Sequence, residues 1–133
     1  MTFREDKRLA HVAQYLAHAE DNMASARVLL DTGHYGNAIS RAYYAVLDAA
    51  MACLVQKDLV PKSHEGTLAL FNLHYIKTGL VEARMSTVLR RIRKERSEAD
   101  YRPMRVFHQS EAEDDYRQAA EFVAMAKTLT GGG

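Results

Sequence analysis

The sequence predicts an all-α fold, an antiparallel up-and-down bundle of four long helices and one shorter helix. Apolar residues recur at helical spacings along most of the 133 residues, and no useful stretch of β-type alternation occurs. Both prolines, Pro61 and Pro103, fall where the helical periodicity already breaks. We expect one domain over residues 1–130, followed by a flexible glycine tail at 131–133.

The first predicted helix covers residues 4–31 and ends just before Gly33, where a left-handed C-terminal cap belongs. Its apolar positions alternate between spacings of three and four: Leu9, Val12, Leu16, Ala19, Met23, Ala26 and Leu30. The second helix covers residues 37–56, with Asn37 as its N-cap. Two adjacent apolar stripes give this helix a face that touches neighbours on two sides, so we expect it at the centre of the bundle.

The third predicted helix is the shorter one and covers residues 63–78. Ser63 is its N-cap, and Gly79 ends it. The fourth helix covers residues 82–100 and carries an apolar inner face among many charged residues. Short connections between these segments favour antiparallel neighbours.

The fifth predicted helix covers residues 111–130. Ser110 and Glu113 have the spacing of a capping box, in which each side chain accepts a hydrogen bond from the backbone of the other residue. Acidic residues in the following turn favour the positive end of the helix dipole. These signals place the start of the helix at residue 111.

The composition is that of an ordinary soluble protein, with 47% apolar and 26% charged residues and a net charge of +1. Any electrostatic function therefore has to come from a local patch. The single cysteine, Cys53, excludes an internal disulfide and fits a reducing cytoplasm. No run of 18 apolar residues occurs, and the first residues are too charged for a secretory signal. We expect a cytoplasmic protein that does not span a membrane.

Charge is distributed unevenly in the C-terminal half. The segment from Arg84 to Arg105 is strongly basic: Arg84, Arg90, Arg91, Arg93, Lys94, Arg96, Arg102 and Arg105 stand against Glu95, Glu98 and Asp100. The following segment, 111–121, is mostly acidic. One interpretation is a pair of solvated helix faces that attract each other across the bundle. The other is a phosphate-binding surface, on which Arg90, Arg93 and Lys94 share one face by spacing.

Four short segments follow one another in a characteristic order. They are Ala-x-x-Arg-Ala-Tyr-Tyr-Ala at 38–45, Pro-Lys-x-His-x-Gly at 61–66, Lys-Thr-Gly at 77–79 and Ala-Asp-Tyr at 99–101. In this order they resemble the small single-domain prokaryotic branch of the HEPN (higher eukaryotes and prokaryotes nucleotide-binding) superfamily. The resemblance implies an antiparallel helical bundle, a homodimer, and a toxin-like role beside a small nucleotidyltransferase antitoxin.

The resemblance also implies where a catalytic site would lie. HEPN ribonucleases pair an Arg, which holds the scissile phosphate, with a His that follows after four to six intervening residues and transfers a proton. In this chain four residues after Arg96 lead to Tyr101, and six residues after Arg93 lead to Asp100, so neither position holds the His. We therefore predict a variant site of Arg96, Asp100 and Tyr101, open to water, with Arg96 on the phosphate. Three other Arg–His pairs have this spacing, and chance predicts nearly as many: Arg4–His11, Arg27–His34 and Arg102–His108.

His64 stands at the start of the third predicted helix, where backbone N–H groups and the helix dipole favour an anion. With Lys62 it is a candidate phosphate ligand. The alternative is that His64 folds back and caps the turn. His11 and His18 share one helix face, but the histidines lack the spacing of a metal site, so we expect neither metal nor cofactor.

Two functions remain open from the sequence. The first is a domain that binds RNA or nucleotide phosphates and acts as a degenerate, metal-independent ribonuclease or toxin. The second is a non-enzymatic dimeric module that presents a surface to a nucleotidyltransferase and receives a nucleotide on Tyr101. A bundle whose charged faces only keep it soluble is the third interpretation.

Overall fold

The computed structural model describes residues 3–131, and this part of the chain is helical throughout, without a strand. Its elements are α1 (Phe3–Asp31), α2 (Tyr35–Gln56), α3 (His64–Phe71), the π-helix η1 (Asn72–Ile76), α4 (Arg84–Tyr101) and α5 (Gln109–Thr130). Four of these helices are long, and α3 with η1 forms the shorter fifth segment. The all-α prediction is confirmed.

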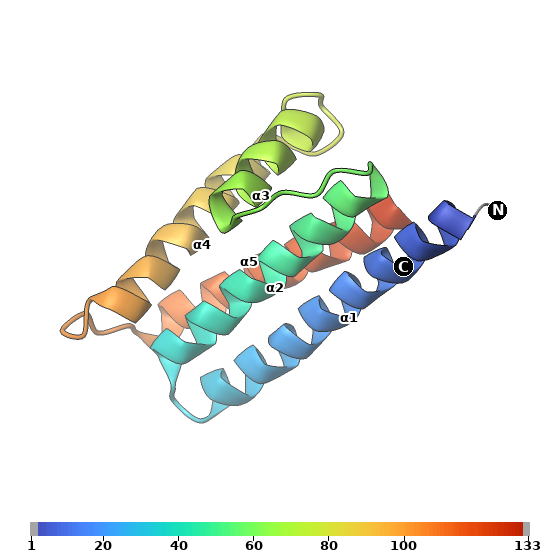
Figure 1. Cartoon of the computed structure of the whole chain (residues 1–133). Helices are drawn as coiled ribbons and strands as arrows, with labels where there is room; N and C mark the ends of the chain where they lie inside the picture. The colour runs from blue at the N-terminus through green and yellow to red at the C-terminus, as the bar shows by residue number, and fades with distance from the viewer. Residues whose placement is uncertain (1–2, 132–133) are drawn as a thin grey trace.

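The four long helices alternate in direction, as an up-and-down bundle requires (Figure 1). In Figure 1, α1 and α4 run one way, whereas α2 and α5 run the other way. The segment of α3 and η1 follows α2 and precedes α4 in the chain. In space it packs against both helices. Since α2 contacts α1, α3, α4 and α5, it is the central helix that its two apolar stripes predict.

The core is built around the small residues of α2, which let the neighbouring helices approach closely. The fully buried alanines of this helix are Ala45, Ala49, Ala50 and Ala52. Larger side chains fill the space between helices, and the ring of Phe71 lies 5.1 Å from that of Phe122. Burial of each such side chain contributes about 1.5–3 kcal/mol. The helix α2 is long and apolar enough to cross a membrane by length and hydropathy alone. Most of it is buried inside the bundle, as is common for the central helix of a helical core.

The turn between α1 and α2 is a Schellman motif. Gly33 has φ 82°, as its predicted capping role requires, and His34 N–H donates to the Leu29 carbonyl at 2.8 Å. Ala38 N–H then donates to the His34 carbonyl at 2.9 Å, which makes His34 the N-cap of α2. The prediction of Asn37 as N-cap is wrong, because the turn at Gly33 leads directly into the helix and Asn37 already lies within the first turn of α2.

The predicted helix over 63–78 is divided into α3 and η1. Ser63 is the N-cap, as predicted, but Lys77 N–H donates to the Asn72 carbonyl at 2.8 Å and widens the last turn into a π-helix. Within this turn Tyr75 is buried, and its hydroxyl donates to the Cys53 carbonyl of α2 at 2.5 Å. This hydrogen bond fastens the shorter segment to the central helix.

The start of α5 differs from the prediction by two residues. The predicted capping box of Ser110 and Glu113 is wrong, because His108 is the N-cap and its N–H donates to Glu111 Oε1 at 2.9 Å. Glu111 also accepts a hydrogen bond from Arg105 Nη2 at 2.6 Å. Hydrogen bonds first from Arg105 and then from the His108 backbone lower the pKa of the Glu111 carboxyl. The contact with Arg105, in the loop before α5, therefore favours Glu111 as the acid that caps the helix.

Two glycines end helical segments in the left-handed region. Gly79 has φ 81° and closes the turn after η1, in agreement with the prediction. Gly131 has φ 70° and ends α5 as its C-cap. Of the predicted flexible tail, residues 132–133 lie outside the described part of the chain, and Gly131 belongs to the helix end.

Candidate functional site

Arg96 lies on the side of α4 that faces α2. Its Nη2 donates a hydrogen bond to the Tyr44 hydroxyl at 2.8 Å, and its Nε lies 3.0 Å from Asp100 Oδ2. The Arg96 side chain is 19% exposed, so its guanidinium is more covered than the open position that the sequence predicts. Two partners on different helices therefore hold this side chain in one orientation.

Three tyrosine rings surround the same guanidinium. The Arg96 Cζ atom lies 5.2 Å from the centroid of Tyr43, 5.4 Å from that of Tyr44 and 5.9 Å from that of Tyr101. These are cation–π distances. Burial alone would lower the pKa of Arg96, but the hydrogen bond to Tyr44 and the nearby Asp100 outweigh it and raise this pKa. The site therefore keeps a permanent positive charge.

Asp100 bridges α4 and α2. Its Oδ1 accepts a hydrogen bond from Ser40 Oγ at 2.9 Å, while its Oδ2 faces Arg96 one helical turn away. Tyr101, the next residue, ends α4 and is 71% exposed. The structure thus brings together the three residues of the predicted variant site.

His64 joins this group from the start of α3. Its imidazole centroid lies 6.0 Å from the Tyr44 ring and 6.3 Å from the Tyr43 ring. The cap of α3 is made by Ser63, whose Oγ accepts the Gly66 N–H at 2.9 Å, so the alternative in which His64 caps the turn is wrong. Lys62 is exposed in the loop before α3, and among the described contacts none joins it to Arg96.

Arg90, Arg93 and Lys94 lie together on the exposed face of α4. With Arg102 they line an open groove of about 380 Å³, in agreement with the predicted shared face. Arg96 is not among the residues that line this groove. Of the predicted phosphate ligands, His64 therefore lies beside the tyrosines of the Arg96 site, Arg90, Arg93 and Lys94 line the neighbouring groove, and Lys62 belongs to neither.

The other arginines of this region pair with α5. Arg91 Nη2 lies 2.6 Å from Asp115 Oδ1, and Arg84 forms an ion pair with Glu121. Arg105, in the loop after α4, pairs with Glu111 at 2.6 Å. The interpretation of two charged faces that attract each other across the bundle is therefore confirmed for these arginines. The bundle uses Arg84, Arg91 and Arg105 to hold α5, whereas the outer face of α4 keeps its cations exposed.

A carboxyl pair is buried behind α4. Asp115 is fully buried, and Glu95 is 17% exposed at the side chain. Burial, and then the hydrogen bond and charge of Asp115, raise the pKa of Glu95 to about 8. Asp115 Oδ2 and Glu95 Oε2 are buried, and each lacks a hydrogen-bond partner when both groups are ionised. A protonated Glu95 could donate a hydrogen bond to the neighbouring Asp115 carboxylate.

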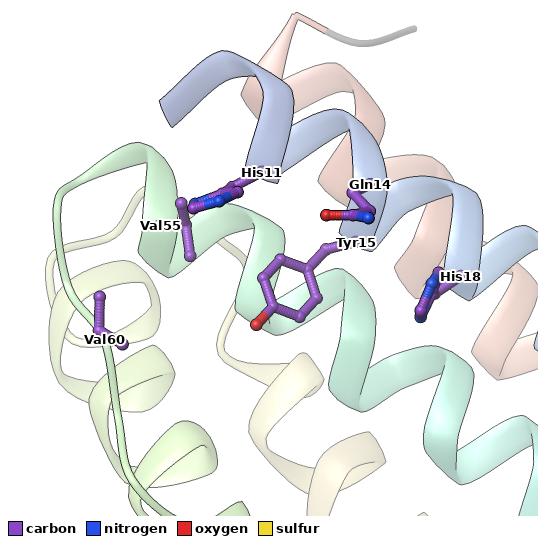
Figure 2. A pocket seen from close by; sticks show the side chains of 6 residues that line it. All are labelled: His11, Gln14, Tyr15, His18, Val55 and Val60. Carbon is purple, nitrogen blue, oxygen red and sulfur yellow. The ribbon is translucent and has the colours of Figure 1, made fainter. Parts of the chain in front are cut away.

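A pocket of about 440 Å³ lies between the first half of α1 and the end of α2 (Figure 2). Figure 2 shows His11, Gln14, Tyr15 and His18 along α1, with Val55 and Val60 on the opposite side. His11 and His18 share one helix face, as predicted. Across residues 3–131, no group of three or more His, Cys, Asp or Glu side chains is placed to hold a metal ion.

Sequence reasoning did not assign the α2 residues of the site. Ser40 and Tyr44 make direct hydrogen bonds to Asp100 and Arg96, and the Arg41 guanidinium lies 5.1 Å from the Tyr44 ring. The available signal was a group of polar and aromatic residues within an otherwise apolar helix. Only the docking of α4 shows which of them face Arg96.

The chance Arg–His spacings form no comparable site. Arg27 is held by Asp31 at 2.6 Å and by Glu113 at 3.1 Å, while His34 caps α2. His108 caps α5 at the other end of the loop from Arg102. The side chain of Arg4, in the remaining pair, lies outside the described residues.

Comparison with known proteins places these features in a family. The model of the HEPN domain matches residues 12–129. A Methanocaldococcus jannaschii protein named "putative toxin" is 35% identical over 83 residues, which cover 62% of each chain. A Thermotoga maritima protein named UPF0332 is 30% identical over 111 residues, 84% of each chain. A UPF0332 protein of Pyrococcus horikoshii is 37% identical over 71 residues, 53% of this chain and 50% of that one.

The relatives are matched to different extents. The matched segment spans less than two thirds of the M. jannaschii protein and half of the P. horikoshii protein. The family model, in contrast, runs from the first half of α1 almost to the end of α5 and includes every residue of the Arg96 site. The chain belongs to the HEPN domain family.

Proposed function

We propose that this protein binds RNA through its phosphates and acts as a toxin-like HEPN protein. The observation that carries the proposal is Arg96, a charged guanidinium held by Asp100 and the Tyr44 hydroxyl beside the exposed ring of Tyr101. A fixed guanidinium recognises phosphate, and an exposed aromatic ring beside it offers a surface on which a base can stack. Two relatives that carry the name "putative toxin" support the same role.

The basic groove on α4 extends this surface. Arg90, Arg93, Lys94 and Arg102 line it, and all four are exposed. Cations along one groove bind successive phosphates and release counterions, so the affinity should fall steeply with salt. We expect RNA to follow this groove and to reach Arg96 at the neighbouring face of the same helix.

The experiment compares Arg96→Ala with the wild-type protein on fluorescent single-stranded RNA in the presence of EDTA. Anisotropy should show a loss of affinity of about tenfold or more for Arg96→Ala, because a charge-assisted contact contributes about 1.5–3 kcal/mol. Arg117→Ala is the matched control, since Arg117 is 71% exposed on α5 and pairs only with Asp114 among the described residues. Equal RNA affinity of all three proteins, or none in the wild type, contradicts the proposal.

A second candidate function rests on the exposure of Tyr101. Its ring is 71% exposed at the end of α4, so its hydroxyl can reach the active site of a nucleotidyltransferase partner. The phenol oxygen would attack the α-phosphorus of a nucleoside triphosphate, forming an O–P bond as pyrophosphate leaves, and a base of the partner would take the proton. Intact mass after incubation with partner and ATP should rise by one nucleotidyl group. An unchanged mass, or the same rise in Tyr101→Phe, contradicts this candidate.

We also propose that the protein is a homodimer. Tyr15, Tyr44 and Met51 are partly buried apolar and aromatic residues on α1 and α2 that pack against the core. A second copy would cover this face of α1 and α2 and bring two Arg96 sites near each other. Light scattering should report twice the chain mass of 15.0 kDa. A single 15.0 kDa species at micromolar concentration contradicts the dimer.

A further inference from the structure

We infer that the hollow between the α3–η1 segment and α4 is a base pocket, in which the Asn72 side chain recognises an adenine of the bound RNA. The inference rests on the proposed RNA binding and deepens it, because it names a base preference and the residue that sets it. Arg96 is not among the residues that line this pocket. The base pocket is therefore separate from the tyrosine-lined site.

The base pocket has a size and a lining that suit a flat heteroaromatic ring. Its volume is about 370 Å³. Leu68 and Ala69 of α3 and Leu89 of α4 give it apolar walls. Asn72, the first residue of η1, and Ser86 of α4 add polar groups. Pockets for small ligands have volumes of about 300–1,000 Å³ and combine mostly apolar walls with a few polar groups, as here.

The polar side chains of the base pocket are free to bind a ligand. Among the contacts of residues 3–131, no hydrogen bond engages the Asn72 amide or the Ser86 hydroxyl. Asn72 is half-buried, and its backbone carbonyl accepts the Lys77 N–H at 2.8 Å, the bond that forms the π-turn. Single π-turns within helical segments are frequent at functional sites. The backbone thus holds Asn72 in place while its amide keeps a donor and an acceptor available.

Two arginines connect the base pocket to the basic groove on α4. Arg90 and Arg93 line both hollows, so a nucleotide whose base enters the pocket has its phosphate near these guanidiniums. Arg90 has no carboxylate partner among the described ion pairs, and its Nη2 only approaches the Thr87 hydroxyl at 3.4 Å. Arg93 pairs with Glu65, but their side chains are 47% and 78% exposed. Because an exposed ion pair contributes little stability, a phosphate can take the place of Glu65 on Arg93.

The donor and acceptor of an asparagine amide match adenine best. Adenine presents its N7 acceptor beside its N6 amino donor, and one amide binds both at once. Guanine presents two acceptors at the same edge, whereas uracil offers one acceptor and cytosine one donor. Each of these bases leaves half of the Asn72 amide unpaired. The second N6 hydrogen of adenine is available to the Glu65 carboxylate, which lines the same pocket.

The test uses fluorescent oligouridine RNA in which one central position is U, A, G or C, with EDTA present and the salt concentration fixed. In anisotropy titrations the wild type should bind the RNA with A about 5–150-fold more tightly than the all-U RNA, the discrimination that one bidentate base contact supplies. Asn72→Ala should bind the all-U RNA within about threefold of the wild type and lose the preference for A. Asn72→Asp should lose it too, because a carboxylate has no N–H for adenine N7.

Leu73→Ala is the matched control for a change in η1. Leu73 follows Asn72 in the chain, is 50% exposed and is not among the residues that line the base pocket. This variant should keep the preference for A. Loss of the preference in Leu73→Ala as well would overturn the specific role of Asn72.

The outcomes separate the base pocket from the proposed RNA binding. Equal wild-type affinity for all four RNAs, or a preference for A that survives in Asn72→Ala, overturns the pocket while RNA binding stands. Loss of the preference in Asn72→Ala, with unchanged all-U affinity in Arg96→Ala, supports the pocket and refutes the contact of Arg96 with phosphate. Absence of any RNA affinity in the wild type refutes both.

Discussion

Replacement of Glu95 by Gln tests the buried carboxyl pair between α4 and α5. In the wild type, burial and then the neighbouring Asp115 raise the pKa of Glu95, while Arg91 Nη2 contacts Asp115 Oδ1 at 2.6 Å. The Glu95→Gln side chain would keep the shape of the original and offer a permanent N–H to Asp115 Oδ2. The substitution therefore preserves the hydrogen bond but removes the titration.

The size of the effect follows from the pKa of Glu95, which the folded state raises from 4.5 to about 8. The folded protein keeps a proton that the unfolded chain loses, so this contribution is complete below pH 4.5 and is lost as the pH rises through about 8. The full difference sets an upper limit of roughly 5 kcal/mol. Relaxation of Arg91 and entry of water reduce this limit. We expect the unfolding free energy of the wild type to fall by roughly 2–4 kcal/mol between pH 5 and pH 9.

Urea unfolding followed by circular dichroism at pH 5, 7 and 9 measures this loss. At pH 5 the two proteins should have similar unfolding free energies, whereas at pH 9 Glu95→Gln should be the more stable by roughly 2–4 kcal/mol. All samples need the same protein concentration, because association makes stability concentration-dependent. Glu82→Gln is the control, since the Glu82 side chain is 72% exposed. Parallel pH profiles of the wild type and Glu95→Gln would refute the raised pKa of Glu95.

Three further substitutions test the fold and the groove. Tyr75→Phe should lower the unfolding free energy by about 1–3 kcal/mol, because it leaves the buried Cys53 carbonyl without its 2.5 Å hydrogen bond; an unchanged urea midpoint contradicts this. Gly33→Ala should lower the unfolding free energy by about 1–2 kcal/mol through backbone strain alone, since φ is 82° and nothing lies within 4 Å of an added Cβ. An unchanged melting temperature in calorimetry contradicts this. Arg90→Ala should reduce the salt dependence of log K for RNA by about one unit of slope; anisotropy at several salt concentrations would show no change if Arg90 contacts no phosphate.

Helix existence was predictable from the sequence, whereas helix starts were not. The alternating spacing of Val12, Leu16 and Ala19 matches a buried stripe because periodicity alone decides which face of a helix can enter a core. The N-caps of α2 and α5 were misplaced because Asn37 and Ser110 have suitable side chains, but neighbouring turns and loop ion pairs decide which residue is used. Local propensity is weak beside such tertiary contacts.

The candidate site was likewise predictable from the sequence only in part. Arg96 and Asp100 lie four residues apart on one helix, so their 3.0 Å contact follows from sequence spacing. The basic face of α4 is likewise a matter of helical periodicity. Tyr44 reaches Arg96 from α2, and His64 reaches the Tyr44 ring from α3, and no spacing in the chain encodes either approach.

The sequence by itself determined the all-α class, the central place of α2, the HEPN resemblance and the cationic face of α4, because each depends on residue types repeated at helical intervals. Only the tertiary structure decided which arginines pair with α5, which carboxyls lie together in the core, and which histidine lies beside the Tyr44 ring. These features depend on distances between helices. Such distances are set by packing of the whole core, and no local segment of the chain contains that information.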